Sequence, residues 1–108
     1  MGMTVLNASE LARAGRKNAP LRKALDQWLH TTESATWESL QELRRSFPSA
    51  DGVAVKLAGG FEVVVTVFNI KGNEYRLITV VNYAVATVLV REILTHAEYS
   101  KGRWKDRL

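Results

Sequence analysis

The fold is decided by one long segment, residues 53–94, which reads VAVKLAGGFEVVVTVFNIKGNEYRLITVVNYAVATVLVREIL. This segment is rich in β-branched residues, which favour strands. Turn signals at Gly59-Gly60 and at Lys71-Gly72-Asn73-Glu74 divide it. We therefore predict an antiparallel meander with strands over residues 53–57, 61–70, 75–83 and 87–94. The nearly continuous apolar run of residues 61–70 is typical of a strand covered on both faces.

The first half of the chain has helical periodicity instead. Leu21, Ala24, Leu25, Trp28 and Leu29 share one helical stripe, and Pro20 suits the first turn of that helix. An earlier helix is expected to end near Gly15, and a third is expected to end at Pro48. For these two helices we predict the N-caps Asn7, as part of a capping box with Glu10, and Thr36.

A short first strand is expected at residues 4–6. Together these elements predict a single α+β domain over residues 1–108, in which the N-terminal helices pack on one face of a mainly antiparallel twisted sheet. Alternation places Arg76, Ile78, Val80 and Asn82 on one face of their strand. In the last strand it places Leu89, Arg91, Ile93 and Thr95 on one face, and Val90, Glu92 and Leu94 on the other.

Composition restricts the chemistry. The 108 residues contain no cysteine and two histidines, His30 and His96, without the spacing of a zinc motif, so we expect no metal and no cofactor. The start of the chain lacks the apolar run of a signal peptide, and no apolar stretch is long enough to cross a membrane. We therefore expect a cytoplasmic protein without a membrane partner.

The net charge of +4 favours a polyanionic partner, although a soluble domain that is simply basic has the same charge. The cations form an early group and a group in the tail. These are Arg13, Arg16, Lys17, Arg22 and Lys23, and then Lys101, Arg103, Lys105 and Arg107.

Several side chains are candidates for chemistry. If a helical turn starts after Thr95, His96 and Tyr99 are neighbours on one face and can exchange protons near neutral pH. The alternative is a solvated histidine beside a packed tyrosine. Arg91 is either a salt-bridge partner or a phosphate ligand.

Four further residues are considered for structural roles. His30 is expected at the end of its helix, where it interacts with the helix dipole. Trp28 and Trp37 are core candidates. Trp104 lies in a charged tail, where it either anchors the terminus or touches a partner.

Four ordered blocks of sequence resemble the HigB family of toxins, within the RelE-like superfamily of messenger RNA interferases. They are Val67 to Leu77, Val81-Asn82-Tyr83, Val90-Arg91 and Thr95-His96-Ala97-Glu98-Tyr99, and the upstream segment with Trp37, Leu40 and residues 47–51 is similar too. The resemblance implies a metal-independent endoribonuclease that acts on messenger RNA, usually on the ribosome. It also implies neutralisation by a HigA-like helix-turn-helix antitoxin, and binding of operator DNA only through the toxin–antitoxin complex.

The resemblance implies a catalytic set of His96, Arg76, Lys71 and Tyr99. Arg76 matches the family's arginine in a Tyr-Arg-Leu strand, Lys71 would hold a neighbouring phosphate, and His96 would transfer protons. Tyr99 is a second proton-transfer candidate or a platform for base stacking. Further RNA contacts are expected from Arg91, Asn69, Asn73 and Lys101.

The chain also departs from the family pattern. Some RelE-type toxins place lysines where this chain has Val67 and Asn69, so proton transfer depends more on His96 here. Ser100 stands where relatives often have an acidic residue. Gly59-Gly60 and the long run after it look like local elaboration. The main alternative function is a non-catalytic RNA- or ribosome-binding module on the same fold, and a third is a structural partner of a DNA-binding protein.

Overall fold

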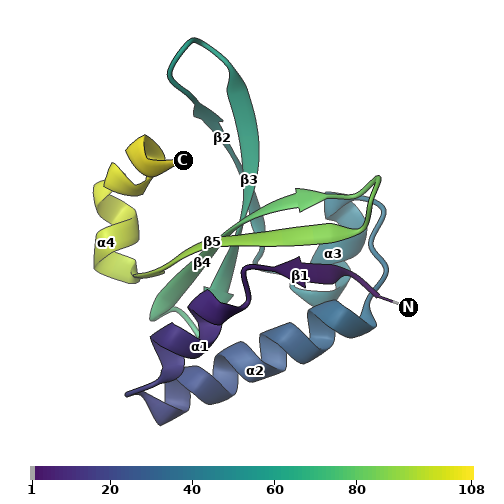
Figure 1. Cartoon of the computed structure of the whole chain (residues 1–108), viewed down its shortest axis with the longest axis vertical. Coiled ribbons are helices and arrows are strands. Elements are labelled where there is room, and N and C mark those ends of the chain that lie inside the picture. The colour runs from purple at the N-terminus through teal and green to yellow at the C-terminus, as the bar shows by residue number, and fades with distance from the viewer. Residues whose placement is uncertain (1) are drawn as a thin grey trace.

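A computed structural model describes residues 2–108 of the chain (Figure 1). Over this range one five-stranded sheet has the strand order β1-β5-β4-β3-β2. Neighbouring strands from β2 to β5 pair antiparallel, whereas β1 pairs parallel with β5. The strands are β1 (Thr4–Leu6), β2 (Asp51–Lys56), β3 (Glu62–Ile70), β4 (Tyr75–Asn82) and β5 (Thr87–Thr95). The predicted meander and the short first strand are confirmed.

Three helices cover one face of the sheet: α1 (Ser9–Gly15), α2 (Ala19–Ser34) and α3 (Leu40–Ser46). Leu25 and Trp28, from the predicted apolar stripe of α2, join Phe68 and Leu77 from the sheet in the larger hydrophobic cluster. Trp28 and Phe68 make an edge-to-face contact with ring centroids 5.3 Å apart. The α+β class, with N-terminal helices packed on a mainly antiparallel sheet, is therefore confirmed.

The chain ends on the opposite face of the sheet, in α4 (His96–Lys101) and the short 3-10 helix η1 (Arg103–Arg107). In Figure 1, α1 and α2 run along the bottom of the view, and α4 lies at the left. Trp104 packs with Val65, Ile78 and Leu94 in a second hydrophobic cluster. Helices thus cover both faces, and Trp104 anchors the C-terminus, one of its two predicted roles.

The β2–β3 hairpin closes where the sequence predicts it. Gly59 and Gly60 both have positive φ, and the Leu57 N–H donates to the Phe61 carbonyl oxygen across the turn. The expectation that β3 is covered on both faces is wrong at its start, because Phe61, just before the strand, is 76% exposed and Val64 is 58% exposed. This part of the hairpin projects beyond the helices in Figure 1.

Both predicted N-caps are wrong. Ala8 is the N-cap of α1, because Asn7 adopts a left-handed conformation and its side-chain amide donates to the Val90 carbonyl of β5. The cap of α3 is Ser39, whose hydroxyl accepts from the Glu42 N–H, so this helix starts later than expected from Thr36. Residues that can serve as N-cap are common near the start of a helix. The local sequence alone therefore does not decide which of them caps it.

The predicted alternation holds in β4 and fails in β5. Thr79 pairs with Val90 and Ile78 pairs with Glu92, which leaves Arg91 as the extra residue of a β-bulge. Val90 consequently lies in the larger cluster and Leu94 in the second one, although they were predicted to share a face. No helix in residues 2–108 is long and apolar enough to span a membrane.

Candidate functional site

Arg76 and His96 come from different elements and meet on the α4 face of the sheet. Arg76 is in β4 and shares the face of Ile78, as predicted, while His96 is the first residue of α4. Thr95 and Glu98 form a capping box that fixes where α4 begins. The Arg76 Nη2 atom lies 3.1 Å from the His96 Nδ1 atom. The two side chains expected to form one site are therefore in direct contact.

This contact fixes the protonation pattern of the imidazole. A guanidinium nitrogen can only donate a hydrogen bond, so Nδ1 of His96 must be the acceptor. The proton of the neutral ring then sits on Nε2. His96 is exposed, so its ring can be reached from solvent.

The Arg76 guanidinium is held from the β3–β4 turn. Nη2 donates to the Asn73 side-chain oxygen at 2.6 Å, and Nη1 donates to the Asn73 carbonyl at 3.1 Å and to the Tyr75 carbonyl at 3.3 Å. The residue is 9% exposed. A buried charge needs such partners, and Asn73 is the side chain that orients the cation by hydrogen bonding. Its predicted role was RNA binding; its contact here is with Arg76.

The same turn carries Lys71 and is tied to α4. The Lys71 ammonium lies 2.9 Å from the Glu74 carboxylate, and this hydrogen bond raises the pKa of Lys71 above its ordinary value. The His96 N–H donates to the Glu74 carbonyl at 2.9 Å. Lys71 is therefore a cation at neutral pH, in a turn that contacts the His96 backbone.

Tyr99 lies beneath Arg76. The guanidinium carbon is 5.6 Å from the centre of the Tyr99 ring, and the Trp104 ring stacks on Tyr99 with centroids 5.4 Å apart and planes 15° apart. Burial raises the pKa of the Tyr99 phenol, with a further increase from Asp51 and an opposing effect from Arg76. The phenol is therefore protonated at neutral pH and has a proton to donate.

The remaining predicted residues are less closely associated with this group. Asn69 is the cross-strand neighbour of Arg76 in β3 and is half-buried. Arg91 donates to the Arg107 carbonyl of η1 at 3.2 Å, and Lys101 is exposed in the last turn of α4. The structure therefore brings together Arg76, His96, Tyr99 and the β3–β4 turn. Arg91 instead contacts the C-terminal turn.

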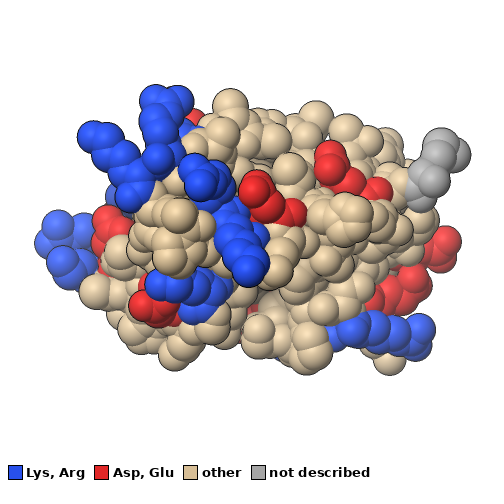
Figure 2. Space-filling view, turned by 90° about the horizontal axis from the view of Figure 1, so that it is seen from below, with Lys and Arg blue, Asp and Glu red and all other residues tan. Residues whose placement is uncertain are grey.

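Basic side chains gather at one end of the molecule. Figure 2, the view onto the helical face, shows Lys and Arg concentrated at the left, the side on which Figure 1 places the α1–α2 junction and α4. The Asn18 side chain links that junction to the sheet by donating to the Tyr75 hydroxyl at 3.1 Å. This hydrogen bond joins the α1–α2 junction to β4 through Tyr75, which packs in the larger hydrophobic cluster on the face opposite to Arg76.

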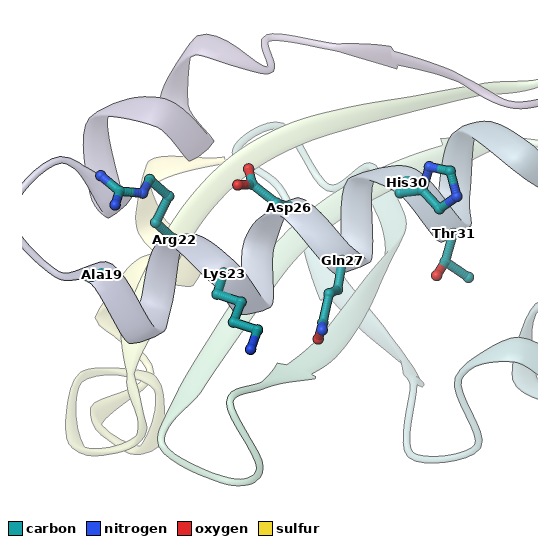
Figure 3. Close-up of a pocket in the computed structure, with 7 residues that line it drawn as sticks. All are labelled: Ala19, Arg22, Lys23, Asp26, Gln27, His30 and Thr31. Carbon is teal, nitrogen blue, oxygen red and sulfur yellow. The ribbon is translucent and has the colours of Figure 1, made fainter.

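A separate shallow groove runs along the outer surface of α2 (Figure 3). It is lined by Ala19, Arg22, Lys23, Asp26, Gln27, His30 and Thr31. His30 was expected to end its helix, but α2 continues to Ser34. This histidine belongs to the groove, away from the contacts of Arg76.

Within residues 2–108, no three His, Asp or Glu side chains lie close enough together to hold a metal ion. Sequence reasoning missed two supporting residues, Asn73 as the acceptor for Arg76 and Trp104 as the wall behind Tyr99. The first had a local signal, because Asn73 lies three residues before the arginine. The second had none beyond an aromatic residue in a charged tail.

Comparison with known proteins gives one result. Residues 21–102 match the model of the family HigB_toxin, described as the RelE-like toxic component of a toxin-antitoxin system. This range runs from α2 to the glycine that ends α4, so it includes Arg76, His96 and Tyr99. A search of curated proteins found no match.

Proposed function

This chain belongs to the HigB family of RelE-like toxins, and on that basis we propose that it is an endoribonuclease that cleaves messenger RNA on the ribosome without a metal ion. As the toxic component of a toxin-antitoxin system it has an antitoxin as its partner. We propose that this antitoxin is a HigA-like helix-turn-helix protein and that operator DNA is bound only by the complex. The observation that carries the nuclease proposal is the 3.1 Å contact between Arg76 and His96.

The chemistry starts with an exchange of partners at Arg76. The Nη2 atom donates one hydrogen bond to the Asn73 side chain and another to Nδ1 of His96. A phosphodiester oxygen is a stronger acceptor for a guanidinium than a neutral imidazole, because the hydrogen bond is then charge-assisted at both ends. The phosphate therefore displaces His96 from Arg76 and frees Nδ1 as a base. Substrate binding itself activates the histidine.

The freed imidazole then acts on the ribose. His96 takes the proton of the 2′-OH, and the resulting oxygen attacks the adjacent phosphorus. The bond from phosphorus to the 5′ oxygen breaks, and that oxygen takes a proton, for which the Tyr99 phenol is the donor. The products are a 2′,3′-cyclic phosphate and a 5′-OH. Deoxyribose lacks the nucleophile, so DNA is not cut.

Two cations stabilise the charge that develops on the phosphorane. Arg76 supplies a planar fork that matches phosphate oxygens, and Lys71 supplies a point charge in the adjoining turn. Asn69 and Asn73 lie next to Arg76 and are proposed to contact the neighbouring nucleotide. Lys101 and Arg91 are proposed to contact the RNA backbone further along the C-terminal helices.

A non-catalytic RNA- or ribosome-binding module is the alternative, because a buried arginine with several acceptors is also found in purely structural roles. Induced expression in a bacterial host separates the two functions. The nuclease proposal predicts growth arrest with transcript cleavage for the wild type, and neither for His96→Ala. Growth arrest without cleaved transcripts, equal in the wild type and the variant, would support the binding module.

A further inference from the structure

Four side chains form a column behind the site, in which cations flank two aromatic rings. Arg76 lies over Tyr99 at 5.6 Å, Tyr99 stacks on Trp104 at 5.4 Å, and the Lys105 ammonium lies 5.7 Å from the Trp104 ring centre. Each contact is within the range of cation–π and stacking interactions. The position of the Arg76 guanidinium is thus connected to the C-terminal turn through one tyrosine ring.

Trp104 is the fixed member of this column. It is 1% exposed and belongs to the second hydrophobic cluster, which also contains Ile78 and Leu94. Its indole N–H donates to the Tyr99 carbonyl at 3.1 Å. The indole therefore holds both the ring and the backbone of Tyr99, whereas Tyr99 itself is only half-buried.

The β-bulge of β5 fastens the turn that carries Trp104. Glu92 accepts from the Arg107 Nε atom at 2.9 Å, and Arg91 donates to the Arg107 carbonyl at 3.2 Å. Consecutive strand residues normally point to opposite faces, and the bulge is what allows both to reach one residue. This gives the bulge a structural function in holding η1 against the sheet.

We propose that Trp104 is a positioning residue for Arg76, acting through the Tyr99 ring, and that η1 is therefore part of the functional site. The proposal rests on the proposed nuclease function for its effect on rate. It does not follow from the family match, which ends at residue 102, before η1 begins. Without the indole, the Tyr99 ring loses the wall behind it and no longer fixes the direction of the guanidinium.

The test compares Trp104→Phe with Trp104→Leu in the full chain. Both variants lose the indole N–H and some core volume, but only phenylalanine keeps a ring against Tyr99. With programmed ribosomes under single-turnover conditions, we expect Trp104→Leu to lower the cleavage rate at saturation by about tenfold. The half-saturating concentration should change less than about threefold, because Trp104 does not contact RNA. Trp104→Phe should restore most of the rate.

A matched control separates positioning from loss of packing. Val55 is buried in the same hydrophobic cluster, on the edge strand β2. Val55→Ala should lower the free energy of unfolding while leaving the rate per folded molecule unchanged. Equal rates for Trp104→Leu and Trp104→Phe, or an equal loss of rate in Val55→Ala, would overturn the proposal.

A structural measurement keeps this proposal distinguishable from the nuclease proposal. Nuclear Overhauser contacts between the Tyr99 ring protons and the Arg76 side chain should be present in the wild type and in Trp104→Phe, and lost in Trp104→Leu. If they persist in Trp104→Leu, Trp104 does not position Arg76. If they follow this pattern but the wild type cuts no RNA, the nuclease proposal fails and the positioning of Arg76 stands.

Discussion

The Arg76 guanidinium donates to the imidazole of His96 across 3.1 Å, although 20 positions separate the two residues in the chain. The β4–β5 pairing makes this possible, because it places Leu94 opposite Arg76 and so returns the chain to the arginine just before α4 starts. An arginine that only donates holds the histidine in the tautomer with its proton on Nε2.

Arg76→Ala should reduce RNA cleavage by about a hundredfold or more, since it removes the main group that stabilises the phosphorane. Arg76→Lys keeps the charge but not the fork held by Asn73, so it should recover only a small part of the rate. Cleavage of a labelled transcript measures both. Arg45→Ala, at an exposed position of α3, is the matched control and should cleave like the wild type. Wild-type rates for Arg76→Ala would remove this arginine from the mechanism.

Asn73→Ala should lower the cleavage rate by about tenfold, because the hydrogen bond of 2.6 Å that orients Arg76 is lost. The backbone acceptors of Arg76 remain, so the variant should still fold. Asn73→Asp keeps the acceptor oxygen but adds a negative charge beside the phosphate, and should bind RNA more weakly. Rate and affinity are measured separately in a single-turnover titration. If Asn73→Ala cuts RNA normally, the side chain does not orient the cation.

The capping box of α4 should make stability depend on pH. Hydrogen bonds from Thr95, first its backbone N–H, lower the pKa of Glu98 below its ordinary value of 4.5. Because the folded pKa is the lower one, the carboxylate stabilises the fold above that value and loses this effect as the pH falls through it. Glu98→Gln should therefore be less stable than the wild type at neutral pH, with a difference that shrinks below about pH 4.

Urea unfolding across this pH range measures the difference in free energy for Glu98→Gln. Glu33→Gln, an exposed position near the end of α2, serves as the control and should follow the wild type throughout. A difference for Glu98→Gln that stays constant with pH would mean that its ionised form does not support the cap.

Metal removal should leave the activity intact. The proposed reaction uses the ribose hydroxyl as nucleophile and side chains for charge stabilisation, so no step passes through a metal ion. Ribosomes themselves need magnesium, so the substrate is a short single-stranded RNA at high toxin concentration, on the proposal that the ribosome presents the messenger RNA and supplies no catalytic group. The purified toxin, freed of its antitoxin, should cut this RNA at the same rate in excess EDTA. Loss of cleavage in EDTA that returns with magnesium would reject the mechanism.

The periodic features of this fold were predictable because each is local. The apolar stripe of α2 and the glycine pair of the β2–β3 turn depend only on residues a few positions apart in the chain. The possible helix start after Thr95 was visible for the same reason, since the capping partner Glu98 is three residues away. The face of Arg76 followed from simple alternation in β4, which has no irregularity before Ile78.

Two of the predictions that failed, the Asn7 cap and the faces of β5, depend on distant partners. Asn7 does not cap α1, because its side-chain amide donates to the Val90 carbonyl, 83 positions later in the chain. The bulge at Arg91 reverses the faces of β5, and only the contacts of Arg91 and Glu92 with η1 give a reason for it. Trp104 gave no local sign that it would stack behind Tyr99. The catalytic candidates could thus be named from sequence and family resemblance, whereas their supports could not.

The chemical identity of the RNA ends tests the central claim most directly. If His96 activates a ribose hydroxyl whose phosphate is held by Arg76, the upstream fragment must end in a 2′,3′-cyclic phosphate or in the 3′-phosphate formed from it. Mass spectrometry of the fragments from a defined transcript distinguishes these ends. We expect cyclic or 3′-phosphate ends with a free 5′-OH on the downstream fragment. Fragments with a 3′-OH and a 5′-phosphate would contradict it.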